Sequence, residues 1–241
     1  MTLHITKRDG TKEAFNADKI NKSIERACFG LTDPISKVTQ IATETRLTVY
    51  DGITTEEMDL ATINAAVQNI QNDTEYDRVA TRLLLKVTYK KVVGEYGNDT
   101  AELNKRHQEK FPQYIQQGIV AGRLDKRMEE KYDLKALAKT LDLSRDELFV
   151  YAGLSSLLDR YAQKDIKGGA IETPQYFFMR LAMGLAYNEK NPTEWAQKFY
   201  DKLSKQEYLT GGSTCIGAGT THPSLSNCFL LQVEDDMRHI A

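Results

Sequence analysis

The chain has 241 residues, of which 41% are hydrophobic and 27% are charged, and its formal net charge is −2. Such a composition is typical of a soluble globular protein, and the small net charge attracts neither nucleic acid nor an anionic membrane. Cys28, Cys215 and Cys228 share no CxxC or CxxH spacing, which argues against a structural zinc site and a disulfide-stapled secreted fold. No apolar run has the length of a signal peptide or a membrane span, so we expect a cytoplasmic protein.

The first 95 residues predict one compact unit. Two short strands, 3–8 and 11–15, flank the turn dipeptide Asp9-Gly10. Capping residues then mark the starts of helices: Asn16, Asp33 followed by a proline, and Thr54 with Glu57 in capping-box spacing. The predicted helices cover about 17–29, 34–50, 55–71 and 75–93. The polar stretch 94–100 indicates a boundary.

The rest of the chain divides into a helical part and a different C-terminal part. Residues 101–204 show almost wholly helical patterns without repeats. After Tyr208, four glycines punctuate a predicted loop, and residues 227–233 then predict a buried strand. Because one strand cannot form a sheet, we expect a second domain to begin there.

The N-terminal hairpin carries the first candidate site. Lys7 and Arg8 lie beside the tight turn, and further polar residues follow at the next helix starts, namely Glu13, Asn16, Lys19 and Thr55. Cations and helix N-termini attract phosphates, while Glu13 and Asn16 can hydrogen-bond a base or ribose. Lys90, late in the fourth helix, could fold over the same place. A nucleoside triphosphate site and an ordinary solvated charge cluster are both compatible with this spacing.

Two segments in this region resemble a known family. ITKRDGTKEAFNADKI and YDGITTEEMD are similar to the two signature stretches of the ATP-cone, and the resemblance covers about residues 3–93. It implies binding of ATP as activator and dATP as inhibitor, with Mg²⁺. Asp59 resembles the eukaryotic-type cone, and we expect it to distinguish dATP from ATP; the number of nucleotides held stays open. The nucleotide-contacting positions implied are Lys7, Arg8, Glu13, Ala14, Phe15, Asn16, Ala17, Asp18, Lys19, Thr55, Asp59 and Lys90.

The C-terminal stretch GAGTTHPSLSNCFLL resembles the entry to the ten-stranded barrel of ribonucleotide reductase large subunits. The resemblance places Cys228 at the position of the family's redox-active cysteine. Reduction of a ribose 2′ carbon consumes two reducing equivalents, which two neighbouring thiols supply as they form a disulfide. The other interpretation of Cys228 is a small apolar residue packed on a buried strand.

The resemblance also implies substrate contacts at Gly212, Ser213, Thr214, Ser226 and Asn227. The chain departs from the family pattern here, because the family usually has a hydroxyl residue at the position of Gly212 and often serine at the position of Asn227. Ser213 or Thr214 could replace the missing hydroxyl.

Further along, the resemblance implies contacts to a specificity effector at Asp236, Met237 and Arg238. A solvated turn after a strand is the alternative interpretation of Asp235 and Asp236.

Together these features predict a mainly α protein with a small β-hairpin. We expect an ATP-cone at 1–95, a helical connector at 96–208 and an incomplete ten-stranded α/β barrel at 209–241. The resemblance implies the N-terminal segment of a ribonucleoside-diphosphate reductase α subunit, of class I rather than class II. That segment would bind no metal itself and would by itself be inactive. The implied partners are the remainder of the α chain as a barrel polypeptide, a radical-generating β subunit, other α chains, and thioredoxin or glutaredoxin.

Two alternatives come from other functional classes. One is a stand-alone ATP-cone regulator without catalysis, although known repressors of that kind carry a cysteine-rich zinc ribbon that this sequence lacks. The other is a helical scaffold protein whose motif matches are accidental. Nucleotide binding would separate the scaffold from the other two.

Overall fold

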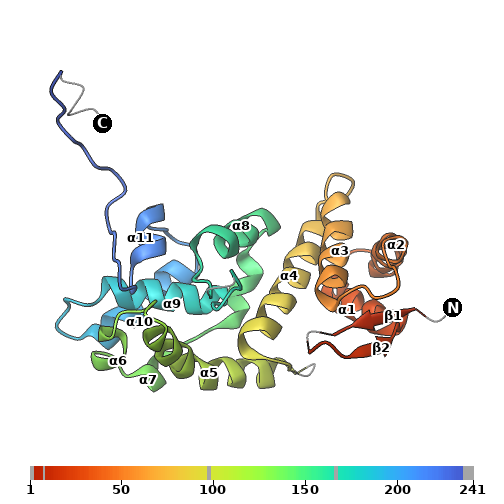
Figure 1. Cartoon of the computed structure of the whole chain (residues 1–241), viewed down its shortest axis with the longest axis horizontal. Coiled ribbons are helices and arrows are strands. Elements are labelled where there is room, and N and C mark those ends of the chain that lie inside the picture. The colour runs from red at the N-terminus through yellow and green to blue at the C-terminus, as the bar shows by residue number, and fades with distance from the viewer. Residues whose placement is uncertain (1–2, 8, 97–98, 166–167, 236–241) are drawn as a thin grey trace. The chain divides into compact units, whose positions relative to one another are not determined.

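A computed structural model describes residues 3–7, 9–96, 99–165 and 168–235 of the chain (Figure 1). Four predicted site residues, Arg8, Asp236, Met237 and Arg238, lie outside the described residues. The fold is mainly helical with one two-stranded antiparallel hairpin, as the sequence predicts. Among the described residues, no helix is both long enough and apolar enough to cross a membrane.

The contacts divide the chain into two compact units. The first consists of residues up to Arg106 together with Asp142–Pro174, and the second of His107–Leu141 together with the residues from Gln175 onward. The first unit therefore includes a segment that is distant in sequence from the predicted cone. The predicted domain division at 95 and 208 stays a prediction.

The hairpin of the first unit is formed by β1 (His4–Thr6) and β2 (Lys12–Ala14), with Ile5 opposite Glu13. Gly10 turns the chain between the strands at φ +83°, a conformation that favours glycine. The outer side of β1 runs beside the segment before the third helix, where the Thr6 amide donates to the Ile53 carbonyl at 2.9 Å. This pairing brings the start of that helix to the hairpin.

Four helices complete the predicted cone: α1 (Ala17–Cys28), α2 (Pro34–Leu47), α3 (Thr55–Gln68) and α4 (Glu75–Val93). Their predicted caps are confirmed, since Asn16 and Asp33 accept backbone N–H groups and Thr54 with Glu57 forms a full capping box. The helices enclose one apolar core, whose fully buried members include Ile24, Ile41 and Val79.

The outer side of α4 packs against the second segment of this unit. That segment holds the 3₁₀ helix η1 (Leu143–Leu148), α8 (Tyr151–Ser156) and the short π-helix η2 (Leu157–Tyr161). The buried Tyr89 hydroxyl donates to the Asp146 carboxylate, and Arg82 pairs with Glu147 at 3.0 Å. Helix α4 thus packs against the cone core with one side and against this segment with the other.

The second unit is helical in its described part. It contains most of α5 (Thr100–Val120), then α6 (Arg127–Glu130), α7 (Leu134–Lys139), most of α9 (Pro174–Leu185), α10 (Pro192–Ser204) and α11 (Gly212–Gly217). Helix α9 is its centre, because nearly all of its side chains are buried. The fully buried Arg180 of α9 donates to the carbonyls of Cys215 and Ala218, at 3.1 and 2.7 Å, and so satisfies the end of α11.

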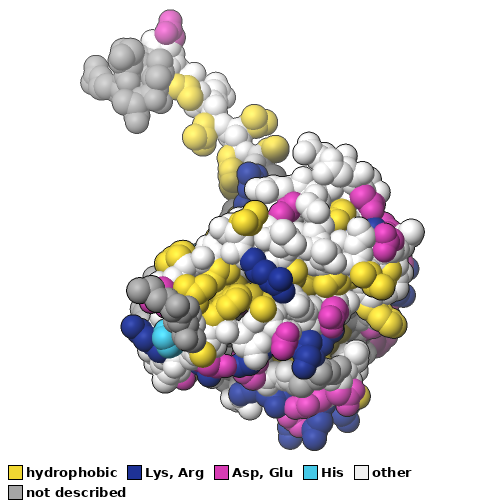
Figure 2. All heavy atoms as spheres, turned by 90° about the vertical axis from the view of Figure 1, so that its right-hand side faces the viewer, with side chains coloured by type: hydrophobic (Ala, Val, Ile, Leu, Met, Phe, Trp, Pro, Cys, Tyr) yellow, Lys and Arg dark blue, Asp and Glu magenta, His cyan; other side chains and the backbone are white. Residues whose placement is uncertain are grey.

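Two local predictions for the C-terminal part were wrong. The glycine-punctuated stretch after Tyr208 is not all loop, because Gly212–Gly217 forms α11 with Thr214 and Cys215 buried. Residues 227–233 form no strand, and Phe229, Leu230 and Leu231 are 72%, 98% and 86% exposed. A strand requires a hydrogen-bonded neighbour, and the structure pairs no other described segment with these residues. Figure 2 shows hydrophobic side chains along this segment, and the barrel stays a prediction.

Candidate functional site

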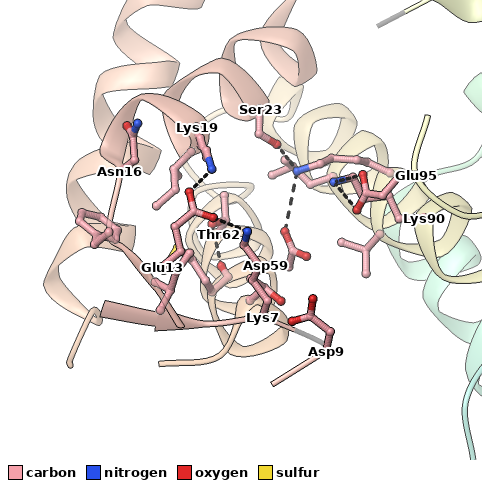
Figure 3. A pocket seen from close by; sticks show the side chains of 18 of the residues that line it. Lys7, Asp9, Glu13, Asn16, Lys19, Ser23, Asp59, Thr62, Lys90 and Glu95 are labelled. Atoms are coloured by element: carbon pink, nitrogen blue, oxygen red, sulfur yellow. Dashed lines mark hydrogen bonds and ion pairs between the residues drawn. The ribbon is translucent and has the colours of Figure 1, made fainter. Parts of the chain in front are cut away.

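A cavity of about 700 Å³ opens between the hairpin and helices α1, α3 and α4 of the first unit (Figure 3). Its size is in the usual range for small-molecule sites. Apolar side chains cover part of its wall, and they are Ile5, Phe15, Ile20, Met58, Leu83 and Val87. The described polar lining contains four lysines and four acids, namely Lys7, Lys19, Lys86 and Lys90 with Asp9, Glu13, Asp59 and Glu95.

Glu13 of β2 joins two of the lysines. Its carboxylate lies 2.6 Å from the Lys7 Nζ and also accepts from Lys19 of α1 (Figure 3). Hydrogen bonds from Lys19 and Lys7 lower the pKa of Glu13 from 4.5 to about 2. The hydrogen bond and charge of Glu13 in turn raise the pKa of Lys7. On this side of the cavity one carboxylate therefore lies between two lysines.

The opposite side of the cavity carries two lysines of α4. Lys90 pairs with Glu95 at 3.0 Å. Lys86 donates to the Ser23 hydroxyl at 2.6 Å, while its Nζ lies 3.8 Å from the nearest Asp59 oxygen (Figure 3, dashed lines from Ser23 and Asp59). Burial lowers the pKa of Lys86, although the charge of Asp59 acts in the other direction. Ser23 belongs to α1 and Asp59 to α3, so three helices meet at this lysine.

Most of the residues that the ATP-cone resemblance implied are brought together here. The cavity lining includes Lys7, Glu13, Phe15, Asn16, Lys19, Thr55, Asp59 and Lys90. It does not include Ala14, Ala17 or Asp18, which lie beside lining residues in the sequence. The backbone N–H of Asp18 instead donates to the Asn16 side chain at 2.8 Å, capping α1.

Sequence reasoning missed several polar lining residues, among them Ser23 and Lys86, which contact each other. The spacing of both residues in the sequence could have indicated them. Ser23 follows Lys19 by four residues, and Lys86 precedes Lys90 by four, so each shares a helix face with a predicted contact.

The cavity is suited to an anionic ligand with an apolar part. The helices α1 and α3 both begin at its edge, near Asn16 and Thr55, and helix N-termini favour phosphate groups. The lysines supply charge, and the apolar wall can pack against a planar ring. Every lysine already has a carboxylate in reach, so an incoming anion must exchange with these internal partners.

The second candidate site lies in the second unit, where the predicted substrate residues are partly assembled. The Ser213 amide donates to the Asn227 side chain at 2.8 Å, and the Thr214 hydroxyl donates to the Leu225 carbonyl at 3.1 Å. A Cβ at Gly211 would lie only 1.4 Å from Asn227 Nδ2, so a larger residue at position 211 would displace Asn227. The start of α11 and the chain around Ser226 and Asn227 are therefore held together.

The three cysteines differ in exposure. Cys228, directly after Asn227, is exposed, whereas Cys28 and Cys215 are buried. Burial raises the pKa of Cys28 to about 11, which keeps that thiol protonated at neutral pH. Of the three, Cys228 is thus the thiol that a reaction partner can reach.

Comparison with known protein families gives two matches. Residues 3–91 match the ATP cone domain, and residues 147–223 match the family described as ribonucleotide reductase, all-alpha domain. On these matches the chain carries an ATP cone and, after it, an all-alpha domain of the ribonucleotide reductase type. An ATP cone implies nucleotide binding, and the cavity lies within the matched residues except for Gly94 and Glu95.

Individual relatives cover almost the whole chain. It is 37% identical to the ribonucleoside-diphosphate reductase subunit alpha of Chlamydia trachomatis over 99% of its length, and 36% identical to that of Helicobacter pylori over 99%. The large subunit of the zebrafish Danio rerio is 28% identical over 97%. The chain spans 22%, 29% and 28% of these three proteins respectively. It is homologous to N-terminal segments of ribonucleotide reductase large subunits.

Proposed function

We propose that the cavity of the first unit binds ATP and dATP and that this binding regulates a ribonucleotide reductase. The observation that carries the proposal is the convergence of Lys7, Lys19 and Thr55 on one cavity within the ATP-cone match. Mg²⁺ enters with the triphosphate, because the cavity offers carboxylate oxygens at Asp9 and Glu13 beside the phosphate-binding lysines.

Calorimetry on the whole chain with ATP and dATP tests this binding. Lys7→Ala should weaken the affinity for both nucleotides by more than tenfold, because a hydrogen bond to a charged group contributes about 1.5–3 kcal/mol. Lys22→Ala is the matched control, since Lys22 is exposed on α1 and does not line the cavity. No heat from the wild-type chain at millimolar nucleotide would refute the proposal.

For the complete enzyme to which this chain would belong, we propose the reduction of ribonucleotides to deoxyribonucleotides by thiyl-radical chemistry. In it this chain supplies the regulatory cone and Cys228, one thiol of the pair that becomes a disulfide. A β subunit supplies the radical, and thioredoxin or glutaredoxin restores the thiols. ATP and dATP shift assembly only if the α–α or α–β states bind them with different affinities. Homology over 99% of the chain supports this proposal over a stand-alone regulator.

Deoxyribonucleotide formation measures the proposed role of Cys228. The chain is combined with the remaining α polypeptide and the β subunit, and Cys228→Ser should abolish multiple turnover because no disulfide can form. Cys215→Ser serves as the control, since Cys215 is buried beneath α9 and faces no solvent. Full activity of Cys228→Ser would refute the proposal that Cys228 is one of the two redox-active thiols.

A further inference from the structure

We propose that Lys86 is a phosphate-binding residue of the cavity and that a phosphate oxygen of the ligand replaces Asp59 as its ionic partner. The inference rests on the proposed nucleotide binding and adds a contact to that same site. The ATP-cone resemblance assigned no role to Lys86, whose position in α4 becomes informative only in the folded cavity.

The contacts of Lys86 leave its charge less well balanced than the charges of Lys7 and Lys90. Lys7 lies 2.6 Å from a carboxylate oxygen and Lys90 lies 3.0 Å from one. The nearest carboxylate oxygen to Lys86 is 3.8 Å away, beyond hydrogen-bond distance, and its close partner at 2.6 Å is the neutral hydroxyl of Ser23. A partly buried ammonium held in this way gains from a closer anion.

The electrostatic surroundings of Lys86 lead to the same conclusion. Burial, together with the nearby charges of Lys90 and Arg26, lowers the pKa of Lys86, while Asp59 and Glu95 raise it. The pKa of Lys7, by contrast, is raised by its bond to Glu13. Desolvation therefore outweighs the stabilisation that the two carboxylates give, and the charge of Lys86 is incompletely compensated, which is the condition that favours a phosphate oxygen.

The position of Lys86 also makes the exchange possible without a large movement. Its Nζ is reached from α1 by Ser23 and from α3 by Asp59, so it lies where three walls of the cavity meet. A phosphate oxygen that enters here can replace Asp59 as the ionic partner while Ser23 keeps its hydrogen bond. Asp59 then loses its ion pair with Lys86, so binding at Lys86 and the orientation of Asp59 are linked.

Calorimetry with ATP on the whole chain provides the test. Lys86→Met should weaken binding by at least about tenfold, because it removes a charge-assisted hydrogen bond. Lys86→Arg keeps the charge and should stay within about threefold of wild type. Lys91→Met is the matched control, since Lys91 is exposed on the same helix and lies outside the cavity lining. Circular dichroism and thermal unfolding check the fold, and Lys86→Gln replaces Lys86→Met if the latter unfolds early.

A double-mutant comparison separates phosphate binding from mere support of Asp59. If Lys86 contacts phosphate, Lys86→Met weakens ATP binding by about tenfold in the Asp59→Asn background as well. A loss that vanishes in that background overturns the proposal, as does Lys86→Met binding like Lys91→Met. A wild-type chain that binds no ATP would instead refute the proposed function itself, so the two failures are distinguishable.

Discussion

At the residue scale, Glu13 is the internal partner with which a nucleotide phosphate must compete for the lysines of the cavity. One carboxylate pairs with both Lys7 and Lys19, and hydrogen bonds from the two lysines lower its pKa to about 2. A triphosphate must therefore compete with Glu13 for both cations. The binding free energy will be smaller than the sum of two isolated lysine–phosphate contacts, because each contact formed with phosphate replaces one formed within the protein.

Asp59 is the residue at which ATP and dATP should be told apart. The two ligands differ by one ribose hydroxyl, so a side chain changes their affinity ratio only if it meets the ribose or positions a group that does. Asp59 lies in the cavity lining one helical turn after Thr55 and can accept a hydrogen bond from that hydroxyl once Lys86 is engaged elsewhere.

We therefore expect Asp59→Asn to change the ratio of dATP to ATP affinity by about fivefold or more, since one hydrogen bond contributes about 1 kcal/mol. Paired calorimetric titrations with the two nucleotides measure that ratio. Glu56→Gln is the control, because Glu56 lies on the first turn of the same helix but not in the cavity lining. Equal weakening of both nucleotides would leave Asp59 a binding role and remove the discrimination.

At the scale of elements, the cone was predictable because its signals are local. Asn16 and Thr54 cap helices through hydrogen bonds to residues two or three positions away, and Gly10 turns the hairpin by its own conformation. Helix ends were placed within about three residues for the same reason. The signature stretches further identified most lining residues of the cavity, but Lys86 needed the fold to bring α4 against α1 and α3.

The segments whose structure depends on distant partners were predicted poorly. The proposed strand at 227–233 lacks a hydrogen-bonded neighbour in the described structure. Helix α11 was missed because its glycines indicate a loop, whereas its last carbonyls are satisfied by Arg180, some 35 residues earlier. Tertiary contacts override local propensity in α11, whereas a strand at 227–233 needs the backbone groups of a neighbouring strand.

Helix α4 contributes side chains both to the cavity and to the contact with η1. The energetic contribution of the second contact can be measured at Tyr89. Lys86 and Lys90 line the cavity, while the Tyr89 hydroxyl donates to Asp146 of η1. Both Tyr89 and Asp146 are buried, and burial together with the charge of Asp146 raises the pKa of Tyr89 well above 10. The hydroxyl is thus a permanent donor at neutral pH.

Removing that donor leaves a buried carboxylate with one partner fewer. We expect Tyr89→Phe to lower the free energy of unfolding by about 1–3 kcal/mol, as measured by urea denaturation. Tyr50→Phe removes a similar donor to Glu57, but Tyr50 is 54% exposed, so water replaces the bond and the free energy of unfolding should hardly change. Equal effects of the two substitutions would mean that the buried bond contributes no more than an exposed one.

At the scale of the whole molecule, the compact units do not follow the two family matches. The all-alpha match begins at residue 147, yet Asp142–Pro174 belongs to the same compact unit as the cone. The wall of the cavity that carries Lys86 and Lys90 therefore packs directly against the beginning of the all-alpha domain. A nucleotide that moves α4 changes contacts of α8 in the same unit without needing any further connecting element.

The apolar segment at 228–233 gives the last prediction. It combines Cys228, Phe229, Leu230, Leu231 and Val233 in one short run of low charge, and its large apolar side chains are exposed. Such a run favours pairing with the same segment of another copy of the chain. Its apolar side chains are exposed, and the described structure gives its backbone no neighbouring strand. We expect the chain to self-associate with rising concentration in sedimentation-velocity experiments, and its amides at 228–233 to exchange rapidly with solvent in the monomer.

Leu230→Asp should shift the chain toward monomer, because it places a charge in the middle of the run. Val120→Asp is the matched control, since Val120 is 90% exposed against 98% for Leu230 but lies at the end of α5, outside any comparable run. Both substitutions replace an exposed aliphatic side chain by the same carboxylate, so the difference between them isolates the segment. A wild-type chain that stays monomeric at all concentrations, or an equal shift by the two variants, would show that this segment does not drive association.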